Sequence, residues 1–195
     1  MSKIKPFLLT IMIAIAALVA VIPASARMGE DVEPGGGGGG GSYPPPTSTS
    51  TGNSLTQESS WQSSNGGRYM YTKATLQRAG ALAGQLDVVT RTKNNVKLTG
   101  FTGGVFILLR NIDGAVIGAT SIQKFGVDGQ WIGRYDRTDY WSWSFDPQVA
   151  AATHSIEIIQ QHSAKELDDQ LAYWQSTICG NLERLGLPKP PYGCP

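Results

Sequence analysis

The stretch VFILL at residues 105–109 decides the fold class of this sequence. All five side chains are apolar, so a strand here has no polar face and must be covered on both sides. Asp113-Gly114 follows, and residues 115–120 are again rich in β-branched side chains. Because an Asp-Gly pair between two such runs is the strongest short-range hairpin signal, we expect the centre of an antiparallel sheet here.

Residues before this run continue the β pattern. Residues 86–92 alternate, with Leu86, Val88 and Thr90 on one side, as in a strand with one buried face. Residues 93–95 read Lys-Asn-Asn, which predicts a turn, and residues 96–99 suit a short strand. By contrast, residues 69–84 place apolar and small side chains at helical spacing, so we expect a helix there.

Residues after the run also predict strands. The candidates are 122–127, 131–135, 140–145 and 155–161, and Asp128-Gly129 between the first two predicts a second hairpin. Short strands with turns at this spacing are typical of a sandwich. The fold class that we predict is mainly β (α+β), with an antiparallel β-sandwich-like sheet over residues 86–161.

The C-terminal part predicts an amphipathic helix over residues 164–185. One apolar stripe repeats at steps of three and four residues; its members are Leu167, Leu171, Trp174, Ile178, Leu182 and Leu185. Ser163 and Glu166 match a capping box, while Gly186 and Pro188 suit the end of the helix. We expect the stripe to pack on the sheet.

The sequence holds two cysteines, Cys179 and Cys194. In an oxidising compartment, such a pair is most simply a disulfide. The bond would tie the proline-rich tail at residues 186–195 to the helix.

The N-terminus has the pattern of a secretory signal over residues 1–26. Lys3 and Lys5 precede a run of 16 residues from 7 to 22 in which only Thr10 is polar, and Ala-Ser-Ala at residues 24–26 suits cleavage. We expect cleavage after Ala26 and a secreted or periplasmic protein. The alternative is an uncleaved anchor in the inner membrane, although the run is shorter than the roughly 20 residues of a membrane span.

Residues 27–66 have the composition of a disordered linker. They include seven consecutive glycines, a proline triplet and a Ser/Thr-rich stretch, with few apolar side chains to offset the entropy of ordering. Trp61 is the exception, and it suits a first contact with the folded part. Residues 67–195 are then a single globular domain, near the usual domain size of about 100–150 residues.

The net charge argues against two classes of protein, dedicated nucleic-acid binders and polybasic membrane-surface proteins. After signal removal, 14 Lys and Arg remain against 15 Asp and Glu. A nucleic-acid binder needs a strong positive balance, and so does a polybasic membrane-surface protein. No second apolar run has membrane length, so we expect neither nucleic-acid binding nor a membrane span after cleavage.

One stretch, residues 131–140, has the character of a binding site. It combines aromatic rings that stack on sugars with charged groups that orient a ligand; the candidate residues are Trp131, Tyr135, Asp136, Arg137, Asp139 and Tyr140. On a strand, Trp141, Trp143 and Phe145 share one face, which suits the core, and Tyr140 lies on the other.

No pattern in the sequence predicts catalysis, a metal site or a cofactor. The motifs of nucleophilic hydrolases, phosphate loops and zinc sites do not occur. His154 and His162 flank the strand at 155–161, which places them about 26 Å apart, too far to share a metal.

Together these patterns favour an exported, non-catalytic binding module of the cell envelope or extracellular space. Its ligand would be a glycan or an envelope protein. One alternative is a small secreted hydrolase in which His154 or His162 meets a carboxylate and a serine. Another is a structural or inhibitor-like protein, which an uncovered apolar helix stripe would indicate.

Overall fold

A computed structural model describes residues 48–64, 67–129, 131–132, 134–191 and 193–194 of the chain. All of them belong to one compact unit. The predicted signal at residues 1–26 lies outside the described residues, as does the first half of the predicted linker. Within the described part, no helix is both long enough and apolar enough to cross a membrane.

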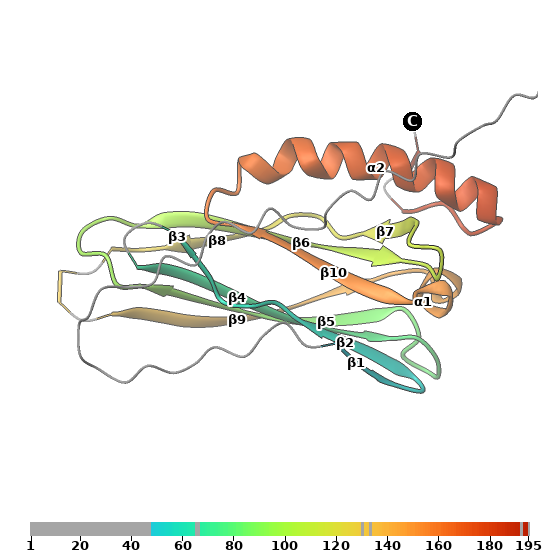
Figure 1. The fold of residues 1–195 in the computed structure, drawn as a ribbon, viewed down its shortest axis with the longest axis horizontal. Coiled ribbons are helices and arrows are strands. Elements are labelled where there is room, and N and C mark those ends of the chain that lie inside the picture. The colour runs from blue at the N-terminus through green and yellow to red at the C-terminus, as the bar shows by residue number, and fades with distance from the viewer. Residues whose placement is uncertain (1–47, 65–66, 130, 133, 192, 195) are drawn as a thin grey trace, which may run out of the picture. The chain divides into compact units, whose positions relative to one another are not determined.

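Two antiparallel sheets form the framework, as the β-sandwich-like prediction requires (Figure 1). The first, sheet A, has the order β1-β2-β4-β5-β9, with β3 also paired to β4. Its strands are β1 (Ser48–Thr51), β2 (Ser54–Glu58), β3 (Gln62–Ser64), β4 (Arg68–Gln77), β5 (Gln85–Asn94) and β9 (Tyr135–Ser144).

The second sheet, sheet B, is centred on the apolar run. Its strands are β6 (Phe101–Arg110), β7 (Val116–Ala119), β8 (Gln123–Val127) and β10 (Ser155–Gln161). β10 pairs with one side of β6, while β7 and β8 pair with successive parts of its other side. Residues 103–109 of β6 are all buried, because sheet A covers one face of sheet B and a helix covers the other. The prediction of a strand covered on both sides is therefore confirmed.

That helix is α2 (Glu166–Leu185), which confirms the predicted C-terminal helix. It lies along sheet B (Figure 1), and the Asn181 side chain donates a 2.8 Å hydrogen bond to the carbonyl of Val116 in β7. Four members of the apolar stripe are buried, namely Leu167, Leu171, Ile178 and Leu182, whereas Trp174 is partly buried and Leu185 at the end of the helix is 39% exposed.

Both ends of α2 can be compared with the sequence pattern. Gly186 adopts the predicted left-handed conformation, with φ of 65°. The predicted capping box is wrong, because Lys165 is the N-cap residue and makes no side-chain cap hydrogen bond. Ser163 is instead held in a parallel bridge with Thr102 of β6, so it does not stand at the cap position.

The predicted disulfide is present between Cys179 and Cys194, whose Cα atoms lie 5.7 Å apart. Cys179 is in α2 and Cys194 is close to the C-terminus. The bond therefore ties the proline-rich tail to the helix, as expected.

The expected helix over residues 69–84 is wrong. Residues 68–77 form β4, in which Met70, Thr72, Ala74 and Leu76 alternate with more exposed neighbours. The period of two places these four side chains in the core, so burial between the sheets outweighs helix propensity.

Part of the segment predicted to be a disordered linker, residues 27–66, is ordered. From Ser48 onward the chain forms β1, β2 and β3. Leu55 is buried in the core and Thr56 meets Thr75 of β4 at 3.0 Å between hydroxyl oxygens. The single domain therefore includes residues before 67, because this polar segment extends a sheet that already has a buried face.

Of the two predicted hairpins, one forms. The Asp113-Gly114 turn joins β6 to β7, and the Gly114 N–H donates to the carbonyl of Asn111 at 3.0 Å. The hairpin predicted at Asp128-Gly129 is wrong, because β8 pairs with β6 whereas β9 pairs with β5 in the other sheet. Residues 96–99, 131, 132 and 134 also lie outside strands.

A short helix, α1 (Pro147–Ala152), joins β9 to β10 and has no counterpart among the predicted elements. Its start carries a local signal, since Asp146 accepts a hydrogen bond from the backbone N–H of Gln148 and proline follows directly.

Candidate functional site

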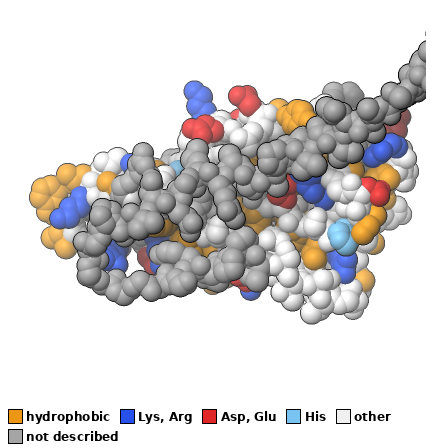
Figure 2. Space-filling model, in the orientation of Figure 1, with side chains coloured by type: hydrophobic (Ala, Val, Ile, Leu, Met, Phe, Trp, Pro, Cys, Tyr) orange, Lys and Arg blue, Asp and Glu red, His pale blue; other side chains and the backbone are white. Residues whose placement is uncertain are grey.

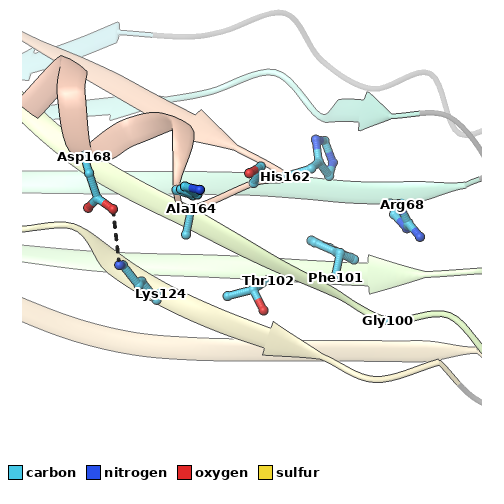
Figure 3. A pocket seen from close by; sticks show the side chains of 10 residues that line it. Arg68, Gly100, Phe101, Thr102, Lys124, His162, Ala164 and Asp168 are labelled. Carbon is cyan, nitrogen blue, oxygen red and sulfur yellow. Dashed lines mark ion pairs between the residues drawn. The ribbon is translucent and has the colours of Figure 1, made fainter.

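A pocket of about 560 Å³ opens at the end of the sandwich where β6 begins (Figure 3). Strand starts, one side of β8 and the turn before α2 contribute its lining. We call it the cationic pocket; it is lined by Arg68, Gly100, Phe101, Thr102, Lys124, His162, Ser163, Ala164, Lys165 and Asp168.

Backbone contacts between β6 and the start of α2 build the pocket. The Ala164 N–H donates to the carbonyl of Thr102 at 3.0 Å, which brings the β10–α2 turn against the first residues of β6. A Cβ placed on Gly104 would lie 3.0 Å from Ala164 Cα and 2.8 Å from Leu167 Cδ1, so glycine is what permits this close approach.

The charge of the cationic pocket is positive. Arg68, Lys124 and Lys165 face a single acidic residue of the lining, Asp168. Lys124 Nζ and Asp168 Oδ2 are 3.7 Å apart, and about half of each side chain is exposed, which makes this a weak ion pair. A small anion that enters the pocket therefore meets an excess of positive charge.

Aromatic rings form one wall of the cationic pocket. Phe101 and His162 have ring centroids 5.4 Å apart, and the Arg68 guanidinium lies 6.0 Å from the Phe101 centroid. Burial lowers the pKa of His162; hydrogen bonding to the Arg68 backbone opposes this shift, and the positive charge of Arg68 adds to it. The imidazole is therefore neutral at pH 7, and the wall can stack against a flat ligand.

A second group of aromatic and charged side chains covers the outer face of sheet A. Trp61 stacks on Tyr71 at 5.3 Å between centroids, and Lys93 Nζ lies 4.7 Å from the Trp61 ring. Glu58 and Lys73 form an ion pair at 2.7 Å. Burial raises the pKa of Tyr71 to about 12, and the adjacent Glu58 carboxylate adds to the rise. The aromatic rings and charged groups of this cluster are therefore paired with one another. The expectation that Trp61 contacts the folded part is confirmed.

The six candidate binding residues of the stretch 131–140 do not form one site. Trp131 lies in the β8–β9 loop with 71% of its surface exposed. Tyr140, which is 79% exposed, and Asp136 point away from the core on the outer face of β9.

The remaining three candidates, Tyr135, Arg137 and Asp139, have the opposite strand parity. Arg137 donates to Asp139 at 2.8 Å and lies within 3.5 Å of the Tyr135 hydroxyl. These three side chains therefore lie on the other face of β9 from Tyr140 and are paired among themselves. They do not form a joint site with Tyr140 and Trp131.

Asp136 is itself engaged in an ion pair. Its carboxylate accepts two hydrogen bonds from Arg91 of β5, at 2.8 and 2.6 Å, and these bonds lower its pKa. Trp141, Trp143 and Phe145 pack against the core, as their shared face suggests.

Neither histidine forms a catalytic constellation in the part of the chain that the structure describes. His154 precedes β10 and is exposed, and His162 follows β10. No described carboxylate lies within 4 Å of either ring as an ion-pair partner. In Figure 3, Asp168 is directed toward Lys124. Among the described residues, no group of three His, Cys, Asp or Glu could hold a metal ion.

The sequence analysis missed the cationic pocket because its residues come from five separate segments. Arg68 and Lys165 are almost a hundred positions apart in the sequence. The one local signal was the Gly103-Gly104 pair ahead of the apolar run, which marks a place where another segment approaches the backbone closely.

Comparisons with known proteins add little to this description. No family model matches the chain, and no curated protein matches it in sequence. It is similar to the crystal structure of a DUF1425 family member from Shewanella sp. pv-4, with 13% identity, coverage of 60% of this chain and 87% of that chain, and a TM-score of 0.28. A TM-score of this size carries no argument, so the fold description rests on the strand pairing given above.

Proposed function

We propose that this protein is an exported, non-catalytic binding module that holds an acidic glycan in the cationic pocket. The observation that carries the proposal is the combination of three cationic side chains with the adjacent, mutually tilted rings of Phe101 and His162. Positive charge favours the acid group, and an aromatic wall suits the apolar face of a sugar ring. The volume of about 560 Å³ is within the range of small-molecule sites.

Each cation has a definable role in this proposal. The Arg68 guanidinium suits bidentate contact with a carboxylate or sulfate, because its donors are arranged in a planar fork. Lys124 and Lys165 act as mobile point charges at the rim. The Asp168 carboxylate reduces the net positive charge of the pocket. We therefore expect neutral polar groups of the ligand to contribute to binding as well.

Two sequence features support export. The N-terminal pattern of residues 1–26 resembles a cleavable secretory signal, and disulfides persist mainly in oxidising compartments. Secretion or periplasmic location follows if the signal is cleaved, and an inner-membrane anchor follows if it is retained. The ligand would then be an acidic polysaccharide of the envelope or its surroundings.

Titration with charged and neutral oligosaccharides tests the proposal. Calorimetry of the wild type should show saturable binding of a uronic-acid oligosaccharide and weaker binding of its neutral counterpart. The variant Arg68→Gln/Lys165→Gln should weaken the affinity about tenfold or more, since hydrogen bonds to charged groups contribute about 1.5–3 kcal/mol each. Arg184→Gln/Lys189→Gln, at the other end of α2 and just beyond it, removes the same charge from exposed positions; it is the matched control and should bind like the wild type.

Two results would count against this proposal. Equal weakening by the pocket variant and the control would mean that only general charge matters. Loss of binding in Trp131→Ala or Tyr140→Ala, with the pocket variant unaffected, would move the glycan site to the residues that the sequence analysis singled out. Circular dichroism of each variant establishes that the fold is intact.

The competing functions have less support. The hydrolase alternative needs a histidine in contact with a carboxylate, and the described residues contain no such contact. The structural or inhibitor-like alternative expected an uncovered stripe on the helix, whereas Leu167, Leu171, Ile178 and Leu182 are buried. The alternative ligand is an envelope protein, and a pull-down tests it if no oligosaccharide binds.

A further inference from the structure

Three large apolar side chains are exposed together at the end of the sandwich that carries the β5–β6 and β8–β9 loops (Figure 1). Leu98 is 65% exposed, Trp131 71% and Ile132 83%. We call these three residues the apolar tip. Figure 2 shows hydrophobic side chains gathered at this end, with Lys and Arg among them.

The two loops of the apolar tip are held against each other. Asn94, which is 2% exposed, donates from Nδ2 to the carbonyls of Thr99 at 2.8 Å and Asp128 at 3.3 Å. A Cβ on Gly129 would lie 2.2 Å from Thr99 N, so the backbones of the two loops are in direct contact. The Asn94 side chain therefore holds both loops of the apolar tip in place.

Leu98 has a backbone conformation that is unusual for its type. Its φ is 64°, in the left-handed region, and it is the one non-glycine with positive φ among the described residues. That region costs a leucine roughly 1–2 kcal/mol, and the exposed side chain gains little from the core in return. Backbone conformations of this kind cluster at ligand-contacting and switch positions.

The charge beside the apolar tip is positive. Lys97 adjoins Leu98, and Arg134 follows the Trp131-Ile132 pair. Neither forms a salt bridge within the described part of the chain. Asp128 is the acid of these loops, so unpaired cations flank the exposed apolar groups.

We propose that the apolar tip docks on a lipid bilayer that contains anionic lipid. Tryptophan prefers the bilayer interface, leucine and isoleucine enter the acyl region, and lysine and arginine are attracted to anionic headgroups. Residues of all three kinds occur together in the two loops at one end of the domain. Docking is peripheral and reversible, because few side chains enter the membrane. It does not depend on whether the cationic pocket binds a glycan.

Vesicle binding by the full chain tests the docking. The vesicles contain phosphatidylcholine with about a quarter phosphatidylglycerol, or phosphatidylcholine alone, so that the charge dependence is measured. The test variant is Trp131→Ser/Ile132→Ser. The matched control is Leu82→Ser/Ile112→Ser, which replaces side chains 58% and 72% exposed in the β4–β5 and β6–β7 loops at the opposite end. All variants share the same N-terminal segment, whose own membrane affinity therefore cancels in the comparison.

The proposal expects the partition coefficient on anionic vesicles to fall about tenfold or more in the tip variant and to stay unchanged in the control. Lipids brominated in the acyl chain should quench tryptophan fluorescence in the wild type, and Trp131→Phe should remove most of that quenching. Equal binding by tip and control variants, or no loss of quenching in Trp131→Phe, would overturn the proposal. A complex with a protein that needs the tip, without tip-dependent vesicle binding, would overturn it as well. Equal thermal midpoints for the two double variants show that folding is not the cause.

Discussion

A hydrogen bond between Thr72 and Gln160 joins the two sheets through the core and can be tested by a double-mutant cycle. Thr72 is in β4 of sheet A and Gln160 is in β10 of sheet B. The Thr72 hydroxyl donates to Gln160 Oε1 at 2.9 Å, and Gln160 Nε2 donates to the carbonyl of Met70 at 3.2 Å. The perturbations are Thr72→Val and Gln160→Met, which preserve shape while they remove the polar atoms.

The burial of the pair sets the expected magnitudes. Thr72 is fully buried and Gln160 is 8% exposed, so a lost partner leaves a buried polar group unsatisfied. Such a group costs about 1–3 kcal/mol. We expect Thr72→Val to lower the free energy of unfolding by about 1–2 kcal/mol and Gln160→Met by about 2–3 kcal/mol. In the Gln160→Met background, Thr72→Val loses only the 3.4 Å contact with the Thr90 hydroxyl, so it should cost far less, and the coupling energy should be about 1 kcal/mol.

Urea unfolding followed by tryptophan fluorescence measures all four members of the cycle. A matched control cycle uses Thr56→Val and Thr75→Val, whose hydroxyls meet at 3.0 Å within sheet A but are only partly buried. Water can replace that partner, so its coupling should be no more than about 0.5 kcal/mol. If Thr72 and Gln160 are additive within about 0.5 kcal/mol, the inter-sheet hydrogen bond contributes no coupling and the argument is refuted.

Three further predictions concern packing, cross-linking and pH. Gly104→Ala should destabilise the protein by about 1–3 kcal/mol through overpacking against α2, whereas Gly126→Ala, which meets nothing within 4 Å, should not; calorimetric melting compares them. Replacement of Cys179 and Cys194 by serine should cost about 3 kcal/mol for a loop of this length, measured by urea unfolding, and no change would contradict the loop-entropy account. Burial lowers the pKa of His162 below its usual 6.5, so its contribution to stability is complete above pH 6.5 and lost as the pH falls through the folded pKa. An NMR titration assigned with His162→Gln checks this, and a pKa at or above 6.5 would contradict it. Acidic-glycan affinity should increase over the same fall in pH.

The elements predicted correctly from sequence are those whose signals are local. Residues 105–109 are apolar on both faces, so a strand formed by them must be covered on both sides, by a sheet or by a helix. The stripe from Leu167 to Leu182 and the glycine at 186 mark the helix and its end within one segment. The disulfide could be predicted from the presence of two cysteines and the expectation of an oxidising compartment.

The errors arose where one local pattern allowed two structures. Residues 69–84 suit helical spacing, yet the alternation of buried side chains from Met70 to Leu76 with more exposed neighbours suits a strand. Only the pairing with β5 and burial in the core decided between the two. Asp128-Gly129 resembles a hairpin turn, but β9 pairs with β5. A turn determines that the chain reverses, and it does not determine which sheet receives the next strand.

Both proposed surfaces depend on such distant choices. The cationic pocket joins Arg68 of sheet A with Lys124 of sheet B and Lys165 before the helix, and the apolar tip joins two loops through Asn94. Side-chain type and periodicity, which the sequence carries, were sufficient for the β-rich class, the C-terminal helix and the disulfide. Contacts between segments far apart in the chain arise only when hydrophobic burial assembles both sheets, and so the tertiary structure alone decided where charge and exposed apolar surface come together.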